Sequence, residues 1–490
     1  MKNFKAEILR HKLIYSLLFF VLLISLFLRV YKLHELLGFY YDQGRDALVI
    51  HRLINDHKPF LVGPVTGIEG IFLGPFFYYL IALFYFLGGG SPVFAAAFLA
   101  WLSVFSILIL FVLGKSFFDR RTGLIAAIIC GFSYSLVIFS RWLANPNPLP
   151  FFSCLILLGL WKIYQGREKI WPVVGFLIGL SLQIEAAGAI FFLPAVLVFI
   201  IWQRKKIKNR KMVILAFLLF LITLLPQVAF NFRHQGILLK SFKKFLLTEK
   251  SFKLSFWQVI KLRLNTYFDV FFSKLFYNQK VISKIFLIIF TSFTFIFRKR
   301  FPKGVKILFI WLLSPLLGLL FYQGNFGYIW DYYFAGVWPI FILLIAFILS
   351  NLWESYFGKV MTLAFFFLFF WVNLNLFKTY YKIGIGIRFR DQLASIDWVY
   401  KDADQNNFNV DVYVPPVIPH AYDYLFQWYG MENYDKQPSE ERESLLYTLY
   451  EVDSAHPERL NAWLVRQEGI GEIIKTQKFG EITTQRRKRK

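Results

Sequence analysis

Eleven long apolar stretches run through the 490-residue chain and restrict what it can fold into. They cover residues 13–30, 92–114, 122–140, 148–164, 170–185, 187–202, 212–229, 281–297, 305–322, 334–350 and 360–377. Each is long enough, or nearly so, to cross about 30 Å of hydrocarbon as an α-helix. Charged residues make up only 17% of the chain, whereas a soluble domain is about a quarter charged. The pattern excludes a soluble enzyme, a disordered chain and a fibrous repeat. It predicts a mainly α, polytopic membrane helix bundle of about 11 spans.

One further apolar run, residues 71–87, is short and contains Gly74 and Pro75 near its start. If this run does not cross, five basic clusters fall on the same side of the membrane. They lie within residues 2–12, 115–121, 162–169, 204–211 and 298–306. Because cytoplasmic loops collect Lys and Arg, we expect 71–87 to be interfacial or re-entrant. The same rule predicts a multi-pass plasma-membrane protein with a cytoplasmic N-terminus and an outer C-terminus.

Two outer loops are large, residues 31–91 and 230–280. The second interleaves Phe and Leu with cations, which is typical of an amphipathic surface helix. Its basic residues are Lys240, Lys243, Lys244, Lys250, Lys253, Lys261 and Arg263. Such a helix either faces headgroups and solvent or binds lipid phosphate. No small-residue cleavage site follows the first apolar run, so we expect that run to be retained as a span.

The composition becomes polar after about Lys378, which predicts a transmembrane domain over 1–378 and a small extracytoplasmic α/β domain over 379–490. Residues 410–414 alternate like a strand. Residues 439–450 and 456–467 are expected to form helices or helix–strand mixtures. The closing run 486–490 is interpreted as a frayed basic tail.

The net charge of +25 does not indicate a nucleic-acid partner here, because the positive-inside bias accounts for it. The two cysteines, Cys130 and Cys154, lie inside apolar stretches and are expected to be packing residues.

The densest polar group of the outer side is Tyr40-Tyr41-Asp42-Gln43-Gly44-Arg45-Asp46. Asp42 and Arg45 are three residues apart, so on a helix they share a face. A carboxylate beside a guanidinium stays ionised and can act as a base, and a guanidinium can bind a phosphate. The alternative is an interfacial ion pair that only fixes the loop.

Other polar residues fall at the outer ends of separate spans. They are Glu69 in the turn 67–75, Arg141, Asn145 and Asn147 after the third span, Gln183 and Glu185 after the fifth, Arg233 after the seventh, and the segment 322–333. Asparagine amides can hydrogen-bond sugar hydroxyls. An acid in an apolar stretch, such as Glu185, indicates function or a solvent-lining position. Since the predicted topology puts all these groups on one face, we expect a site there.

No motif for zinc, for a P-loop or for a dinucleotide is present. We therefore assign no cofactor; a divalent metal stays an open alternative that no motif supports.

This order of features resembles the C-type membrane glycosyltransferases, most of all family 39, the protein O-mannosyltransferase and aminoarabinose-transferase group. The residues that carry the resemblance are Asp42-x-x-Arg45, Gly74-Pro75 with Tyr78-Tyr79, and Arg141 with the turn after it. The chain departs from the family at Gln43, where relatives often carry Glu, and at Asn145 and Asn147, where many carry Asp. It also has no Lys or His before Gly74-Pro75, where relatives often have a charged residue before a Pro-Pro pair.

The resemblance implies transfer of a hexose or pentose from a polyprenyl-phosphate donor to an acceptor hydroxyl on the outer face. Asp42 matches the catalytic aspartate and Arg45 a residue that holds the donor phosphate. We expect Arg141 and Arg233 to add phosphate contacts. The expected sugar or acceptor pocket comprises Tyr41, Asp46, Glu69, Asn145, Asn147, Gln183 and Glu185. The acceptor, whether protein, lipid or glycan, stays open.

Two other functions fit a polytopic chain. A transporter or lipid-linked sugar flippase would favour inverted repeats or mid-membrane charges, and neither is evident. An oligosaccharide ligase or polymerase would use a pyrophosphate carrier.

Overall fold

The computed structural model describes residues 2–247, 254–322, 325–415 and 418–490. Lys250 and Lys253 of the predicted basic loop, and residues 323–324, lie outside these ranges. The helices up to the seventh predicted span are α1 (Lys2–Arg10), α2 (Lys12–Val30), α3 (Leu33–Leu36), α4 (Tyr41–Asn55), α5 (Phe76–Leu87), α6 (Pro92–Phe117), α7 (Arg120–Phe132), α8 (Tyr134–Arg141), α9 (Leu149–Tyr164), α10 (Trp171–Ile184), α11 (Ala186–Ala189), α12 (Phe192–Gln203) and α13 (Arg210–Arg233).

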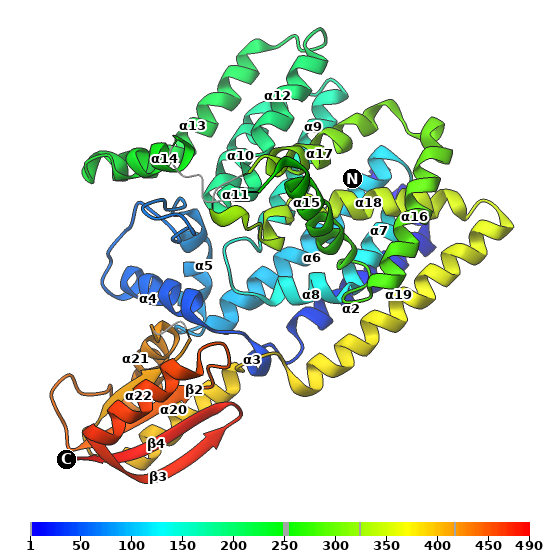
Figure 1. The fold of residues 1–490 in the computed structure, drawn as a ribbon. Helices are drawn as coiled ribbons and strands as arrows, with labels where there is room; N and C mark the ends of the chain where they lie inside the picture. The colour runs from blue at the N-terminus through cyan, green and yellow to red at the C-terminus, as the bar shows by residue number, and fades with distance from the viewer. Residues whose placement is uncertain (1, 248–253, 323–324, 416–417) are drawn as a thin grey trace.

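The later elements include a four-stranded sheet. They are α14 (Ile237–Leu247), α15 (Phe256–Phe272), α16 (Lys280–Ile296), α17 (Lys306–Leu320), a short 3-10 helix at Asp331–Phe334, α18 (Trp338–Leu352), α19 (Tyr356–Ile383), α20 (Phe389–Ala403), β1 (Asn409–Tyr413), α21 (His420–Tyr434), β2 (Leu445–Glu451), α22 (Pro457–Ile470), β3 (Gly471–Phe479) and β4 (Ile482–Arg489). The long helix α19 leads from the bundle to the C-terminal domain, and α4 lies beside that domain (Figure 1).

Each of the eleven predicted stretches contains a helix. Within the described residues, 7 helical stretches are long and apolar enough to cross a membrane, or up to 8 if α7 and α8 form one bent span. Three more apolar helices are shorter: Phe76–Leu87, Leu149–Tyr164 and Trp338–Leu352. The chain is thus a multi-pass helical membrane protein, while the number of spans stays a prediction. At about 1.5 Å per residue, the 12 residues of α5 are too short to cross.

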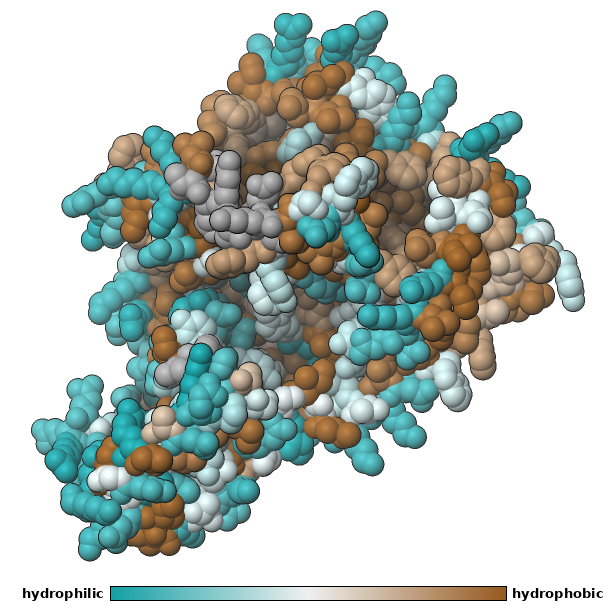
Figure 2. All heavy atoms as spheres, in the orientation of Figure 1, coloured by the Kyte–Doolittle hydropathy of each residue, from teal (hydrophilic) through white to brown (hydrophobic). Residues whose placement is uncertain are grey.

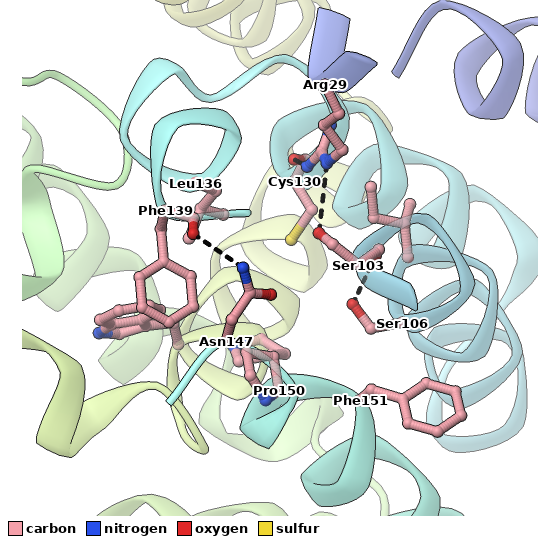
Figure 3. A pocket seen from close by; sticks show the side chains of 12 residues that line it. Arg29, Ser103, Ser106, Cys130, Leu136, Phe139, Asn147, Pro150 and Phe151 are labelled. Carbon is pink, nitrogen blue, oxygen red and sulfur yellow. Dashed lines mark hydrogen bonds between the residues drawn. The ribbon is translucent and has the colours of Figure 1, made fainter. Parts of the chain in front are cut away.

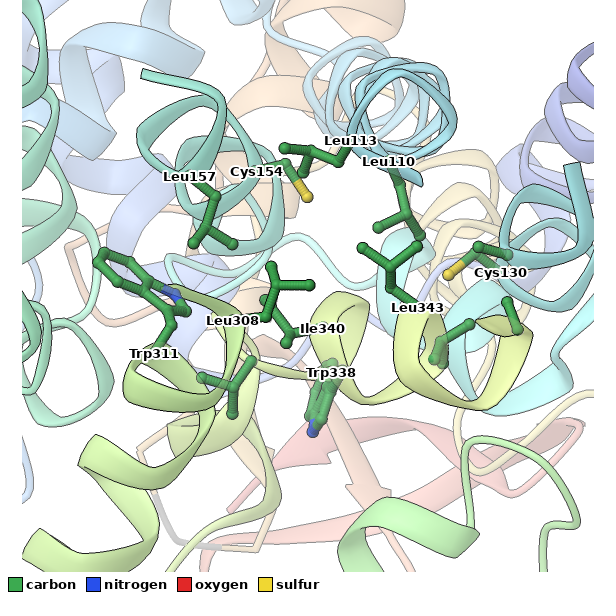
Figure 4. Close-up of a cluster of buried hydrophobic side chains, with 14 of the residues drawn as sticks. Leu110, Leu113, Cys130, Cys154, Leu157, Leu308, Trp311, Trp338, Ile340 and Leu343 are labelled. Carbon is green, nitrogen blue, oxygen red and sulfur yellow. The ribbon is translucent and has the colours of Figure 1, made fainter. Parts of the chain in front are cut away.

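Apolar side chains hold the bundle together. Figure 4 shows Leu110 of α6, Cys154 and Leu157 of α9 and Trp338 of α18 meeting in the core. Cys154 lies there as a free thiol, and so does Cys130. Helices also meet through small residues, as is common in membranes: a Cβ on Gly175 would lie 2.0 Å from the Ala216 carbonyl oxygen. On the face in Figure 2 the bundle is rich in brown, apolar residues, and teal residues gather on the C-terminal domain.

Polar contacts link the predicted cytoplasmic loops in two pairs. The Glu7 carboxylate pairs with Lys115, and Arg120 Nη2 lies 3.1 Å from the same oxygen. Glu168 accepts hydrogen bonds from the backbone N–H groups of Lys208 and Asn209. These contacts join loops that the charge pattern assigned to a common side.

The third predicted span is broken by 62° between α7 and α8. Arg29 of α2, fully buried, donates to the carbonyl oxygens of Cys130 and Gly131 at the end of α7 and to Ser103. Figure 3 shows this guanidinium beside a cavity of about 30 Å³. A cation at the carboxyl end of a helix is favourable because the last carbonyls carry partial negative charge. Arg29 thus stabilises the break, from which α8 leads to the turn carrying Asn145.

The C-terminal domain is a mixed sheet of order β1-β2-β4-β3, with β1 parallel to β2 and the other pairs antiparallel. The predicted strand at 410–414 is β1, and the predicted element at 456–467 is helix α22. Residues 439–450 do not form a helix: the segment ends in strand β2.

The interpretation of residues 486–490 as a frayed tail is wrong. Most of the run belongs to β4, and Arg487 is buried. Its guanidinium donates to the carbonyl oxygens of Gln467 and Gly471, both at 3.0 Å, and to Thr448. Buried hydrogen-bond acceptors, which no local charge pattern reveals, explain the basic residue at this position.

Candidate active site

Helix α4 presents Asp42 in its first turn. The Gln43 side chain accepts a hydrogen bond from the Tyr40 backbone N–H at 3.1 Å, which satisfies a donor left free at the helix start. Negative charge is favoured at this end of a helix. The Asp42 side chain is 59% exposed, so a substrate can reach its carboxylate.

A chain of polar contacts behind Asp42 fixes its orientation. Arg45 Nη1 lies 2.9 Å from Asp42 Oδ1, while Arg45 Nε and Nη2 donate to Asp46 Oδ1 at 3.0 and 2.7 Å. The Tyr78 hydroxyl of α5 donates to the same Asp46 oxygen at 2.8 Å. Two motifs that lie apart in the sequence, residues 40–46 and the aromatic start of α5, therefore form one network.

Burial raises the pKa of Asp46 to about 6, although Arg45 and the Tyr78 hydroxyl act in the opposite direction. Taking a carboxylate out of water disfavours its charged form. Asp46 therefore gains or loses its proton near pH 6, where the Arg45 guanidinium stays charged.

A second carboxylate, Glu185, lies between α10 and α11. It accepts from the Ala187 backbone N–H at 3.1 Å and from Asn145 Nδ2 at 3.2 Å. Asn145 Nδ2 also donates to the Ile184 carbonyl at 2.7 Å. The structure therefore brings together Asn145 and Glu185, which the sequence placed after two different spans.

Tyr332 lies near both acidic centres. Burial raises the pKa of its hydroxyl above the usual range, and the negative charges of Glu185 and Asp42 raise it further. Its ring lies 5.8 Å from that of Trp142, in the turn that carries Asn145. The first outer loop and the ends of two spans therefore converge around this tyrosine.

Gln183 joins the loop before α5 to the bundle. Its Oε1 accepts from the Phe76 backbone N–H at 3.1 Å, and its Nε2 donates to the Thr223 carbonyl. A Cβ at Gly74 would lie 2.3 Å from the Gln183 side chain. Glycine is therefore needed at position 74, because the backbone there lies against the buried Gln183 amide.

Four predicted site residues have other surroundings. Arg141 is buried and donates to the carbonyls of Arg29 and Tyr31, both at 2.8 Å, so it caps the end of α2. Asn147 donates to the backbone carbonyls of Ser140, near the end of α8, and of Trp142. Glu69 is 96% exposed, with Lys244 at 3.9 Å, and Arg233 is exposed at the end of α13.

Sequence reasoning did not single out Lys274. It is buried, with its Nζ 2.6 Å from Asp331 Oδ2 and 4.0 Å from the ring centre of Trp338. Asp331 directly precedes Tyr332. The only local signal was one lysine inside the apolar run Phe-Phe-Ser-Lys-Leu-Phe, which indicates a paired charge.

The C-terminal domain holds the segment that leads into α4. The Phe39 carbonyl accepts from Gln392 Nε2 at 2.9 Å, and the Tyr40 hydroxyl donates to the Ile387 carbonyl at 3.1 Å. The Tyr41 ring lies 5.0 Å from the His420 ring of α21. Asp42 is therefore set between the bundle and this domain.

No group of three or more His, Cys, Asp or Glu side chains suited to a metal occurs among the described residues. The nearest charge to Asp42 is the Arg45 guanidinium, which would repel a cation.

Residues 73–230 match the family model described as dolichyl-phosphate-mannose-protein mannosyltransferase. No curated protein matches the chain in sequence. The crystal structure of ArnT from Cupriavidus metallidurans bound to undecaprenyl phosphate is similar with a TM-score of 0.62, at 10% identity, over 98% of both chains. Its apo form gives a TM-score of 0.61 at 10% identity and the same coverage.

Archaeal oligosaccharyltransferase AglB from Archaeoglobus fulgidus, in complex with an inhibitory peptide and a dolichol-phosphate, is similar with a TM-score of 0.54 at 12% identity. The match covers 94% of this chain and 73% of AglB. At these identities the structures establish the fold, and the family model adds the link to mannosyltransferases. The chain is therefore an integral membrane protein with the C-type glycosyltransferase fold, and it resembles family 39.

Proposed function

We propose that this protein transfers a hexose or pentose from a polyprenyl-phosphate donor to an acceptor hydroxyl, with Asp42 as general base. The observation that carries the proposal is the exposed Asp42 carboxylate, which the Arg45–Asp46–Tyr78 network holds in place. Support for a lipid-phosphate donor comes from the family model and from the undecaprenyl phosphate and dolichol-phosphate in the similar structures.

The chemistry needs one base and one leaving group. Asp42 takes the proton of the acceptor hydroxyl while that oxygen forms a bond to the anomeric carbon. The bond between this carbon and the phosphate oxygen breaks, and polyprenyl phosphate leaves with the bonding electrons. Cations near the phosphate would stabilise the charge that develops there.

We propose for Arg45 a role other than the phosphate contact that the resemblance to family 39 implies. Its Nε, Nη1 and Nη2 atoms already bind Asp42 and Asp46, so we assign it to positioning the base. Arg141 is likewise occupied by carbonyls, and we assign it no phosphate. Arg233 is exposed and remains the proposed phosphate contact.

Glu185 and Asn145 are proposed to bind sugar hydroxyls. We expect Glu185→Gln to raise the KM for donor about ten-fold, with a smaller change in kcat, since one hydrogen bond to a charged group is worth about 1.5 kcal/mol or more. Steady-state kinetics over a donor series would measure this. Glu354→Gln, at an exposed ion pair with Arg300, is the control. An unchanged KM for Glu185→Gln would remove this residue from the pocket.

The network behind Asp42 predicts an acid limb in the pH–rate profile. Below a pH of about 6, Asp46 becomes protonated and holds Arg45 less strongly, so transfer should fall. The contribution of Asp46 to the free energy of unfolding should change in the opposite direction, so that it is larger at low pH than at neutral pH. Because folding raises this pKa above the ordinary 3.8, the stabilisation from this group is complete below pH 3.8 and is lost as the pH rises through about 6.

Tyr78→Phe tests this assignment. It removes a hydrogen bond that favours the ionised form of Asp46, so the acid limb should move to higher pH. Among the described residues, the neighbouring Tyr79 hydroxyl hydrogen-bonds the backbone of Phe60, and Tyr79→Phe should leave the limb in place. Equal shifts in the two variants would contradict the role given to Asp46.

We further propose that the site lies on the outer face of the plasma membrane, with the N-terminus cytoplasmic. The experiment that tests the function is transfer of radiolabelled sugar from a panel of polyprenyl-phosphate donors to membrane extracts by the purified protein. Product formation supports a transferase. Absence of product with every donor, together with labelling of the Glu185 site from both sides of the membrane, would favour a transporter.

A further inference from the structure

We propose that the free edge of β1 binds an extended polypeptide segment with basic side chains, which adds to the sheet as a fifth strand. This surface belongs to the C-terminal domain, and the proposal does not depend on the transferase activity.

β1 is the first strand in the order β1-β2-β4-β3, so it pairs on one side only. A cavity of about 720 Å³ lies against it and is lined by four consecutive residues, Val410 to Tyr413. Successive strand residues point to opposite faces of a sheet. One cavity can contact all four only if it lies along the strand edge, where backbone N–H and C=O groups have no strand partner.

Helices wall this cavity on both faces of the sheet. On one face Trp463 of α22 donates to Asp411 Oδ1 at 3.2 Å, and its ring lies 5.8 Å from Tyr413. On the other face Val410 and Val412 pack against the core formed with α20 and α21. The Ser439 backbone N–H donates to the Phe408 carbonyl at 2.8 Å, which closes the slot at the start of β1.

The charge of the slot selects its occupant. Its lining includes three carboxylates, Asp411, Asp423 and Glu440, against one guanidinium, Arg466. Arg466 already pairs with Asp411 at 3.0 Å, and His420 lies 3.4 Å from Asp423. Glu440 has no ion pair with any described residue. In a chain of net charge +25, this acidic slot favours a basic segment.

The opposite edge of the sheet lacks these features. β3 is exposed along most of its length and carries Lys475 and Lys478, and lysines on an edge strand oppose strand addition. Strand addition to a free edge draws its affinity from backbone hydrogen bonds and its specificity from flanking side chains. β1 has both the free edge and the flanking walls.

The test uses the full-length protein in nanodiscs of phosphatidylcholine, which carries no net charge to attract the probe. The probe is a fluorescein-labelled octapeptide of alternating lysine and valine, and binding is followed by fluorescence anisotropy. We expect saturable binding that weakens at least ten-fold when alternate amides of the peptide are N-methylated, because one hydrogen-bonding edge is then lost. Equal binding of the methylated peptide would overturn the proposal.

Two charge-reversal variants, one at each edge of the sheet, locate the binding site. The double variant Asp423→Lys with Glu440→Lys should weaken peptide binding at least ten-fold, while Glu472→Lys on β3 should not change it. The reverse pattern would place the peptide on the other edge and contradict the proposal. Dimers in sedimentation that the double variant abolishes would also contradict it, because the occupant would then be a second copy of this chain.

Discussion

Asp42→Asn should lower kcat for sugar transfer by about 10²–10⁴-fold, the range that a positioned general base contributes. An amide cannot take the proton from the acceptor hydroxyl. The donor KM should change little, because Asp42 is assigned to the acceptor. The side chain is largely exposed, so thermal unfolding of the variant should match the parent protein. Kinetics at saturating donor, with the unfolding midpoint measured on the same preparation, checks the prediction.

The same helix provides a matched control. Asp56 follows the last turn of α4 and pairs with Lys58 at 3.2 Å on the surface. Asp56→Asn makes the same chemical change without reaching the site, so transfer should persist at the parental rate. If Asp42→Asn also transferred sugar at that rate, the base would have to be another group.

Gly44→Ala should disturb the contact between α4 and the C-terminal domain. A Cβ at Gly44 would lie 2.2 Å from the backbone nitrogen of Ala421, at the start of α21. Backbone atoms cannot move aside as a flexible side chain can. We expect a stability loss of about 1–3 kcal/mol, the usual cost of overpacking, and a fall in transfer because Asp42 lies two residues away. Thermal unfolding and limited proteolysis between the two domains would measure it.

Helix propensity alone predicts that Gly44→Ala stabilises the protein, so the measured change in stability distinguishes the two effects. Alanine normally stabilises the interior of a helix by about 0.5–1 kcal/mol relative to glycine. A Cβ added at Gly469 of α22 would point into open space, with no neighbouring heavy atom within 4 Å. Gly469→Ala should therefore be neutral or stabilising. A stabilised and fully active Gly44→Ala would show that the α4–α21 contact does not constrain the site.

Much of the fold follows from the sequence because apolar stretches and charge bias act over whole segments. The helices in all eleven stretches and the short helix α5 were predictable in this way. The third span is different. Its 62° break is stabilised by Arg29, which lies about a hundred residues earlier in the chain. Hydropathy does not reveal such a long-range contact.

Some contacts among the candidate residues were predictable from the sequence, and others were not. The spacing of Asp42 and Arg45 indicated a shared face, and the two form an ion pair at 2.9 Å. Arg141 looks equally suited to an anion in the sequence, yet carbonyls occupy it. Whether an arginine meets an anion or a helix end depends on tertiary packing. The same reason explains why buried Lys274 was missed.

The measurement that tests the central claim most directly is mass spectrometry of the carrier lipid recovered after turnover. The proposed reaction releases one polyprenyl monophosphate for each sugar transferred, and Asp42→Asn should release almost none. Recovery of a polyprenyl pyrophosphate would instead indicate an oligosaccharide ligase or polymerase. Intact donor that moves across the membrane without losing its sugar would identify a flippase and contradict the role proposed for Asp42.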